Sequence, residues 1–344
     1  MKSHPITIKD IARELGVSPS TVSRALKDHP DISEETRRQV KELADRMKYK
    51  PNAIALSLKN RKSNVVGVVI PQILHYFFSS VISGIEDVAG KYGYSVMIAQ
   101  SNELFEKEVE AMATLADGRI DGLLISIAKE TVKYDHLRQL KEEGIEIVFF
   151  DRVPDEFKSD SVVIDDFQGA LKGVQHLIEH GRRRILHLAG PQTRLIGRKR
   201  LKGYLQAIEN NRIPYDEKLV VHCDSFDEAL RIIPELVNGG LDFDAVFTVN
   251  DFTAAGVIQA LKKLGKRIPE DIAVVGYGDD DIAHMIDPTL TTIRQPGKEM
   301  GMRAMELLHK RLTSTEEATD IISEVLQAEL LPRESTLGHF RQEK

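Results

Sequence analysis

Residues 7–26, TIKDIARELGVSPSTVSRAL, constrain the fold most, because they encode two short helices joined by a tight turn. Thr7 and Asp10 form a capping pair at the start of the first helix, and apolar residues then recur at helical spacing. Gly16 can adopt the left-handed conformation that ends a helix, and Ser18 followed by proline is typical of a new helix start. The segment therefore predicts a helix-turn-helix unit.

The second helix of this unit turns its apolar residues back onto the first helix. Its outward side carries short hydroxyls and one arginine. Such a surface suits the major groove of DNA, where hydroxyls contact phosphates or base edges and arginine can pair bidentately with guanine. An ordinary helical hairpin is the alternative. The predicted DNA contacts of the head are Thr7, Ser18, Pro19, Ser20, Thr21, Ser23 and Arg24.

A third helix is predicted after Ser33, with an apolar stripe that closes a small three-helix core. Charge supports an independent basic head. Residues 1–63 hold 14 Lys and Arg against 8 Asp and Glu, a net charge of +6, whereas the remaining chain holds 33 against 45, a net charge of −12. This asymmetry is typical of a nucleic-acid-binding module attached to a domain that does not touch DNA.

At this point the chain resembles the LacI/GalR family of bacterial transcription regulators. The resemblance covers nearly the whole chain, through the ordered motifs TIKDIA, VSPSTVSRAL, YKPNAIALSL, VGY and LPREST. It implies that the second helix reads the major groove through Pro19, Ser20 and Arg24. Because Pro19 and Ser20 lack a long donor, Arg24 is expected to carry much of the direct readout.

Residues 51–59, PNAIALSLK, begin with proline and are too short to form a stable helix alone. The resemblance implies a hinge helix that orders on operator DNA, lies in the minor groove and inserts a leucine between the central base pairs. Many relatives carry Arg or Gln where this chain has Leu56, and a plain linker is the alternative. The predicted hinge contacts with DNA are Asn52, Ala55, Leu56 and Leu58.

From Val65 onward, short β-branched runs alternate with helical stretches, which predicts a doubly wound α/β core of parallel strands. Roughly 280 residues are too many for one such sheet, so two lobes are expected. The predicted strands are 65–70, 95–99, 122–127, 146–150, 185–189, 245–249 and 272–277. The predicted crossover helices are 81–91, 167–180, 199–210, 225–237 and 252–264.

The resemblance implies a periplasmic-binding-protein-like core of two lobes, with the chain crossing between them near Ile164, Ile293 and Ser323. The predicted fold is thus a small all-α head on a two-lobed α/β core. The predicted boundaries are 1–50 for the helix-turn-helix domain, 51–63 for the hinge helix and linker, and 64–344 for the effector-binding and dimerisation core. The lobes are expected at 64–164 with 294–323 and at 165–293 with 324–337.

Ligands of such folds bind at the carboxyl ends of the strands, which here means the cleft between the lobes. Planar bidentate groups and aromatic rings suit a small polyhydroxylated ring, so a sugar or sugar derivative is the expected effector. Capping, core packing and surface ion pairing are the alternatives for these side chains. The predicted effector contacts are Phe77, Phe78, Asp151, Arg200, Asn250, Asp251 and Asp279.

One departure from the family concerns this cleft. Many relatives have an effector-binding Asp directly after G-[FY], where this chain has Gly278. Asp279 could swing in to replace it.

Enzyme-like patterns are weak. Residues 176–180, HLIEH, match a zinc-peptidase motif, but no third ligand is evident, and no nucleotide-binding glycine motif follows a strand. The single cysteine, Cys223, excludes an internal disulfide. We therefore expect no catalytic residue, metal or cofactor. Without a signal peptide or a run of 18 apolar residues, a cytoplasmic, nucleoid-associated protein with no membrane partner is expected.

These patterns favour a homodimeric, effector-responsive transcription regulator, a repressor, that binds pseudo-palindromic operator DNA. The alternative is a cytoplasmic sugar-binding or sugar-modifying protein whose helical head mediates protein contacts. A steep loss of DNA affinity with salt would favour the regulator, because several phosphates are then neutralised by each dimer.

Overall fold

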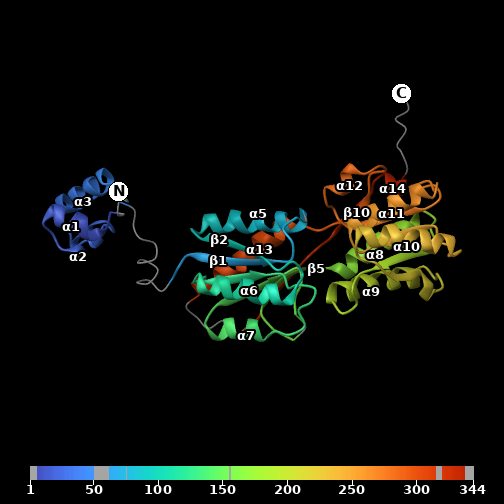
Figure 1. Cartoon of the computed structure of the whole chain (residues 1–344), viewed down its shortest axis with the longest axis horizontal. Coiled ribbons are helices and arrows are strands. Elements are labelled where there is room, and N and C mark those ends of the chain that lie inside the picture. The colour runs from blue at the N-terminus through green and yellow to red at the C-terminus, as the bar shows by residue number, and fades with distance from the viewer. Residues whose placement is uncertain (1–5, 50–61, 75, 155, 315–319, 338–344) are drawn as a thin grey trace, which may run out of the picture. The chain divides into compact units, whose positions relative to one another are not determined.

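The structure is a computed structural model that describes residues 6–49, 62–74, 76–154, 156–314 and 320–337 (Figure 1). The chain forms two compact units, Met1–Asn64 and Val65–Lys344. The first is the small helical head, and the second is the α/β core.

The head consists of α1 (Ile8–Leu15), α2 (Pro19–Ala25) and α3 (Glu34–Arg46). The Asp10 carboxylate accepts hydrogen bonds from the backbone amide and the hydroxyl of Thr7, at 2.9 and 2.7 Å. Gly16 ends α1 with a φ of 65°. Ser18 caps α2 by accepting from the amide of Thr21 at 3.0 Å. The predicted helix-turn-helix unit is therefore confirmed.

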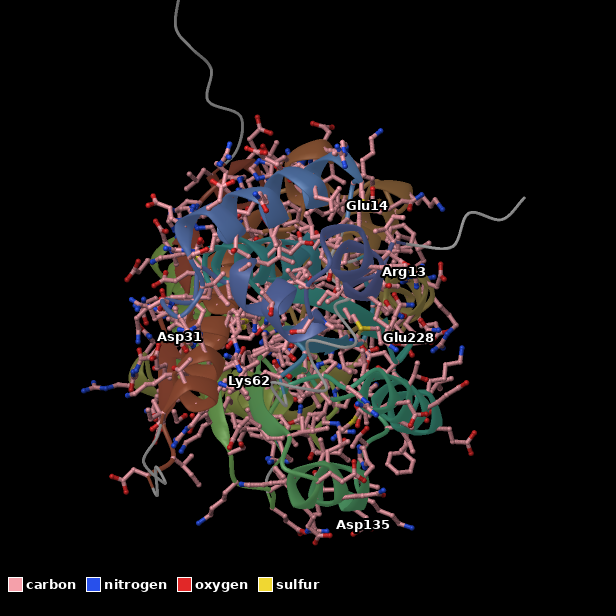
Figure 2. All side chains as sticks on the ribbon, turned by 90° about the vertical axis from the view of Figure 1, so that its left-hand side faces the viewer. Arg13, Glu14, Asp31, Lys62, Asp135 and Glu228 are labelled. Atoms are coloured by element: carbon pink, nitrogen blue, oxygen red, sulfur yellow. The ribbon has the colours of Figure 1, made fainter. Side chains whose placement is uncertain are left out.

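One apolar core holds the three helices of the head together, and the predicted stripe of α3 belongs to it. Charged residues lie outside it: Arg13 and Glu14 are exposed on α1 (Figure 2). The head thus has its own buried core, as predicted. Its fully buried apolar residues are Ile11, Ala12, Val22, Ala25, Val40, Leu43 and Ala44.

The first lobe of the core is built on a parallel sheet with the order β11-β5-β4-β3-β1-β2. Its strands are β1 (Val65–Ile70), β2 (Ser95–Gln100), β3 (Gly122–Ile125), β4 (Glu146–Phe150), β5 (Asp160–Ile164) and β11 (Ser323–Leu326). Its helices are α5 (Tyr76–Lys91), α6 (Phe105–Asp117), α7 (Asp135–Glu142) and α13 (Gly297–Thr313). Alternate strand residues point to opposite faces. Val66 and Val68 pack with α5 and α13, whereas Val69 packs with α6 and α7.

The second lobe is built on a sheet with the order β12-β10-β9-β8-β6-β7, parallel except for β12. Its strands are β6 (Ile185–Ala189), β7 (Val220–His222), β8 (Ala245–Thr248), β9 (Ala273–Gly278), β10 (Thr291–Arg294) and β12 (Glu329–Leu331). Its helices are α8 (Asp166–Glu179), α9 (Leu195–Asn210), η1 (Glu217–Leu219), α10 (Phe226–Asn238), α11 (Asp251–Lys263), α12 (Ile282–Met285) and α14 (Glu334–Leu337). One sheet face packs on α8 and α9, and the other on α10 and α11.

The chain crosses between the lobes three times: after β5, after β10, and between β11 and β12. The first two crossings follow Ile164 and Arg294, close to the predicted positions. The third lies between Leu326 and Glu329, three residues beyond the predicted Ser323. All seven predicted strands are present, within two residues at each end, and the described residues form five further short strands that the patterning does not predict.

Helices α5 and α13 are far apart in sequence but pack with their backbones in contact. A Cβ atom at Gly84 would lie 2.1 Å from the carbonyl oxygen of Lys298, and one at Gly301 would lie 2.0 Å from that of Val81. Any larger side chain at either glycine would force the two helices apart. The first lobe therefore depends on a helix that follows the second lobe in the chain.

Candidate functional site

A cavity of about 200 Å³ lies between the two lobes and is lined by side chains from both. From the first lobe it is lined by Phe77, Phe78, Glu103, Lys129, Asp151 and Arg152. From the second lobe it is lined by Gly190, Pro191, Arg194, Ile196, Gly197, Arg200, Asp224, Val249, Asn250, Phe252, Tyr277 and Asp280, and Gln295 follows β10 at the crossing. Many of these residues follow the carboxyl ends of strands, which is where parallel α/β sheets bind their ligands.

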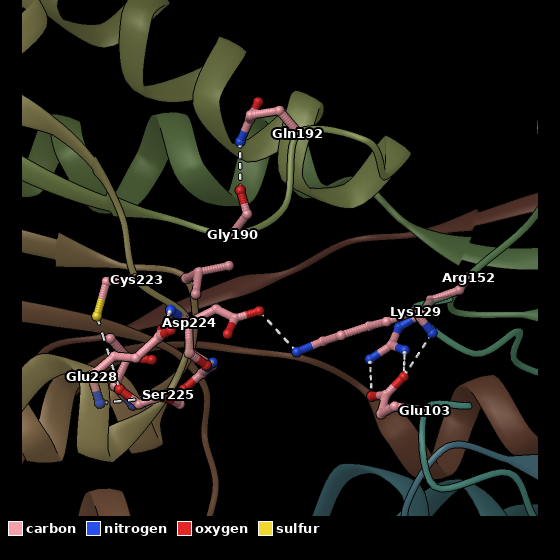
Figure 3. A network of polar contacts seen from close by, with 12 residues as sticks. Glu103, Lys129, Arg152, Gly190, Gln192, Cys223, Asp224, Ser225 and Glu228 are labelled. Carbon is pink, nitrogen blue, oxygen red and sulfur yellow. Dashed lines mark hydrogen bonds and ion pairs between the residues drawn. The ribbon is translucent and has the colours of Figure 1, made fainter. Parts of the chain in front are cut away.

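Two polar contacts between long side chains and the opposite lobe join the walls of the cleft. The ammonium group of Lys129 donates to the carboxylate of Asp224 at 2.8 Å (Figure 3). The guanidinium of Arg194 donates to the carbonyl oxygen of Thr131, also at 2.8 Å. Both contacts span the cleft and so exist only while the lobes are close together.

A third contact between the lobes involves Asp280, which follows β9. Its carboxylate accepts from the backbone amide of Phe77 in the first turn of α5. The residue is only 6% exposed, and its Oδ1 has no hydrogen-bond partner among the described residues. Burial raises the pKa of Asp280 to about 6, because the charged form loses its hydration.

Arg200 projects from α9 into the wall of the cleft and is 6% exposed. Its Nε donates to Asp166 at 2.8 Å, and its Nη1 donates to the carbonyl oxygen of Val249. Its guanidinium carbon lies 3.5 Å from the centre of the Tyr277 ring, a cation–π geometry. Arg200 therefore helps to build the cleft wall and also lines the cavity.

Two adjacent residues after β4 bring opposite charges to the first-lobe wall. Asp151 has a φ of 60° and accepts from the hydroxyl of Ser126 at 3.2 Å. Burial raises its pKa to about 6. Arg152 forms two hydrogen bonds with Glu103, at 2.7 and 3.1 Å (Figure 3). The left-handed backbone of Asp151 is a strained conformation for a residue other than glycine, and such strain is found preferentially at binding sites.

Aromatic rings form the apolar part of the lining. Phe77 and Phe78 are both buried and meet edge to face, with ring centroids 5.2 Å apart. Phe252 and Tyr277 line the cavity from the second lobe. Ring faces next to carboxylates and guanidinium groups are the surroundings that a polyhydroxylated ring requires.

The structure brings five of the seven predicted effector contacts together around the cavity: Phe77, Phe78, Asp151, Arg200 and Asn250. Asn250 also has a structural role. Its side-chain oxygen caps α11 by accepting from Thr253 at 2.7 Å, and its amide donates to the carbonyl oxygen of Asp224 at 2.9 Å. It therefore lines the cleft with both polar atoms already engaged.

The other two predicted contacts, Asp251 and Asp279, are not among the residues that line the cavity. Asp251 is fully buried, accepts from the hydroxyl of Thr292 at 2.6 Å and from the amide of Asp280 at 2.9 Å, and has a pKa that burial raises to about 7. Asp279 does not swing into the cleft, because its carboxylate pairs with Arg333. The neighbouring Asp280 lines the cavity in its place.

Sequence reasoning also missed five further charged residues of the cleft: Glu103, Lys129, Arg152, Arg194 and Asp224. Each lies in a loop that follows a strand, so position was an available signal. Each also reads as an ordinary surface charge when taken alone. Their convergence is a property of the two lobes together.

The candidate nucleic-acid surface lies on the head. Thr7, Ser18, Pro19, Ser20 and Arg24 are exposed, whereas Thr21 and Ser23 are half-buried. The hydroxyls of Ser18 and Thr21 are 2.9 Å apart and hydrogen-bonded, so they are partly used within the head. Arg24 is the long exposed donor of α2. The predicted hinge contacts Asn52, Ala55, Leu56 and Leu58 lie outside the described residues.

The zinc-like pair on α8 is explained by packing. His176 is buried and hydrogen-bonds the hydroxyl of Thr336 at 2.8 Å, and burial lowers its pKa to about 4. In the described part of the chain, no three or more His, Cys, Asp or Glu side chains are grouped so that they could hold a metal ion. None of its helices is long and apolar enough to cross a membrane.

Comparison with known proteins matches both units. Residues 7–52 match the family described as "Bacterial regulatory proteins, lacI family", and residues 174–336 match a periplasmic binding protein-like domain. Catabolite control protein A of Priestia megaterium is 31% identical over 307 residues, which cover 89% of this chain and 92% of that protein.

Two solved structures are similar along almost the whole chain. The Lac repressor dimer bound to operator and the anti-inducer ONPF is 26% identical with a TM-score of 0.84, covering 97% of this chain and 99% of that one. The complex of the transcriptional regulator CelR with cellobiose is 31% identical with a TM-score of 0.72, covering 96% and 99%. Each of these alignments covers nearly all of this chain, and so includes both the head and the two-lobed core.

Proposed function

The chain belongs to the lacI family of bacterial regulatory proteins, and we propose that it is a transcriptional repressor whose affinity for operator DNA is controlled by a sugar or sugar derivative. One observation carries the proposal: a helix-turn-helix head with an exposed reading helix and a core with a cavity between its lobes occur in one chain. The family consists of transcriptional regulators, and we propose no catalytic activity. We expect the protein at the nucleoid, where its DNA lies.

The head reads DNA through α2 in the major groove. Arg24 is exposed and long enough to pair bidentately with a guanine, whereas Pro19 and Ser20 are short. Thr7 and Ser18 lie where helix ends can contact phosphates. Direct base readout is therefore concentrated on Arg24.

The protein acts as a homodimer on a pseudo-palindromic operator, as supported by the Lac repressor relative, which is a dimer bound to operator. The proposed hinge helices meet at the operator centre, where Leu58 of each chain wedges into the minor groove. Asn52, Ala55 and Leu56 complete the proposed hinge contacts.

The effector binds in the cleft between the lobes, as supported by the CelR relative, whose structure is a complex with cellobiose. Phe77, Phe78, Asp151 and Arg200 are the proposed contacts, since they line the cavity from both lobes. A ligand held by both lobes changes their relative position and so the separation of the hinges. Such coupling is typically about 1–3 kcal/mol and is reciprocal, so operator DNA must change effector affinity by the same factor.

Selection of binding sites from random DNA, with and without a panel of sugars, tests this function. We expect a palindrome with a central C-G step, an affinity that falls steeply with salt, and a change in affinity with at least one sugar. A protein whose head mediates protein contacts would instead bind DNA weakly and with little salt dependence, and that result would refute the proposal.

Two variants separate specific from non-specific binding. Arg24→Ala and Leu58→Ala should each weaken operator binding while leaving binding to random DNA nearly unchanged. Arg38→Ala is the matched control for charge, because Arg38 is exposed on α3 and paired with Glu35. Equal loss on both DNAs in the Leu58 variant would exclude the wedge.

A further inference from the structure

One loop of the first lobe carries the partners of both long side-chain contacts across the cleft. Residues 128–131, which we call the closure loop, follow β3. The side chain of Lys129 donates to Asp224 at 2.8 Å (Figure 3). The carbonyl oxygen of Thr131 accepts from Arg194, also at 2.8 Å. The position of a single loop therefore decides whether either contact with the second lobe can form.

A buried carboxylate of α6 holds the closure loop, none of whose four residues lies in a helix or strand. Glu108, in the first turn of α6, accepts from the backbone amide of Ala128 at 2.6 Å through its Oε2. Its Oε1 accepts from the hydroxyl of Thr131 at 2.9 Å. The Nε2 of His136, on α7, hydrogen-bonds the same oxygen at 3.0 Å. Both ends of the loop are thus fixed to one side chain.

Glu108 itself lies outside the ligand cavity. Its side chain is fully buried, and it is not among the residues that line the cavity. A buried carboxylate is costly unless donors surround it, and two of its three partners belong to the closure loop. Glu103 also accepts from the amide of Lys129, but Glu103 lines the cavity. Of the two carboxylates, Glu108 is therefore the one whose effect on the cleft passes through the loop.

We propose that Glu108 is a positioning residue for closure of the cleft: it holds the closure loop where Lys129 and Thr131 reach the second lobe. This inference rests on the proposed function, in which a ligand held by both lobes controls the separation of the hinges. The free energy difference between the open and closed arrangements then depends on a side chain that no ligand touches.

Pulsed electron paramagnetic resonance on the full-length protein measures the separation of the lobes. Spin labels at Gln139→Cys on α7 and Lys202→Cys on α9 mark one exposed position in each lobe, and the native Cys223 is buried. Labelled chains are diluted with unlabelled chains, so that a dimer carries one labelled pair. We expect Glu108→Met to raise the ratio of open to closed cleft about 2- to 10-fold, the range for a lost hydrogen bond.

Conservative variants and a control accompany this substitution. Glu108→Gln keeps an acceptor for the amide of Ala128 and should stay within about twofold of the wild type. Thr131→Val removes the hydroxyl bond alone and should open the cleft in the same direction by less, so it decides the test if Glu108→Met does not fold. Glu106→Met makes the same exchange at an exposed position of α6 and should match the wild type. Unchanged distances in both Glu108→Met and Thr131→Val would overturn the inference.

A cycle of variants separates positioning from a general loss of stability. Lys129→Gln combined with Arg194→Ala removes both contacts with the second lobe and should open the cleft by itself. Adding Glu108→Met should then change the distances little, because the loop no longer has partners to reach. Further opening of the same size would show that Glu108 acts independently of these contacts, which contradicts the proposal. Operator binding is measured separately, so failure of the proposed function itself would be seen there.

Discussion

Lys129 of the first lobe donates a hydrogen bond to Asp224 of the second lobe at 2.8 Å, across the mouth of the cleft. The two side chains are 40% and 17% exposed. Ion pairs this accessible contribute little to global stability, typically about 0–1 kcal/mol. The contact between Lys129 and Asp224 nevertheless forms only in the closed cleft, because it is lost when the lobes separate.

Lys129→Gln should therefore affect the cleft more than the fold. We expect the unfolding free energy to change by less than about 1 kcal/mol. The affinity for a bound sugar should fall several-fold, since the open arrangement gains population. Calorimetric titration and denaturant unfolding measure the two quantities. Lys133→Gln, at a nearby exposed position, should change neither. A Lys129 variant with normal sugar affinity would contradict the role of the pair.

Arg200→Ala should destabilise the core and also remove the sugar response. The substitution leaves Asp166, which is 4% exposed, without its cationic partner. Removing one partner of a buried ion pair typically costs about 3–5 kcal/mol. Thermal unfolding of the full chain should show a lower Tm for the core. Arg198→Ala, exposed on the same helix, provides the control, and equal Tm values for the two variants would refute the prediction.

Gly16→Ala should weaken the head through the backbone alone. Gly16 has a φ of 65°, and a Cβ atom there would meet no heavy atom within 4 Å. The left-handed conformation should therefore cost about 1 kcal/mol of head stability. Hydrogen exchange of the head amides measures this local loss. Gly90→Ala, within α5 and also without a steric contact, should be neutral or stabilising. If Gly90→Ala were destabilised as much as Gly16→Ala, the left-handed backbone of Gly16 would not be the cause of the loss.

The stability of wild type and Asp280→Asn should differ with pH. The pKa of Asp280 is raised to about 6 by burial, with Asp281 and Asp279 adding repulsion and Asp251 packed beside it. The folded state therefore binds the proton more tightly than the unfolded state. Burial of the charged carboxylate therefore lowers the free energy of unfolding. This destabilisation is absent below pH 4, grows between pH 4 and 6, and is complete above pH 6. The variant should be up to about 3 kcal/mol more stable than the wild type at pH 7, and equal to it near pH 4.

The difference between the two proteins is the informative quantity. His176 and His187 are buried with pKa values lowered to about 4, so they add stability as the pH rises from 4 to 6.5. Both histidines are present in both proteins, and their contribution cancels in the comparison. Denaturant titrations at a series of pH values measure the difference in unfolding free energy between the two proteins. A difference that does not change with pH would exclude ionisation of Asp280 as its cause.

The fold class followed from hydrophobic patterning because the central strands are buried on both faces. The run Val65–Ile70 is apolar throughout, so its assignment needed no tertiary information. Strand β11 (Ser323–Leu326) alternates exposed and half-buried residues at a sheet edge, and no apolar run marks it. Short edge strands of this kind are defined by their neighbours rather than by their own sequence.

The site was predictable only in part, for a physical reason. Arg200 and the Phe77–Phe78 pair follow strands in recognisable motifs. Asp280 lines the cavity and Asp279 does not. This difference depends on backbone φ angles of 144° at Gly278 and 64° at Asp279, which the sequence spacing does not reveal. The pair Lys129 and Asp224 joins residues 95 positions apart, so it exists only once both lobes have folded.

The contact of α5 with α13 through Gly84 and Gly301 bears on how the protein is made. The ribosome produces most of the second lobe, through β10, before it produces α13 and β11, both of which the first lobe requires. At about 5–20 residues per second, the stretch from Ile164 to Leu326 takes roughly 10–30 s to synthesise. During that time the apolar face that α13 later covers stays exposed, and exposed apolar surface of this kind is prone to aggregation.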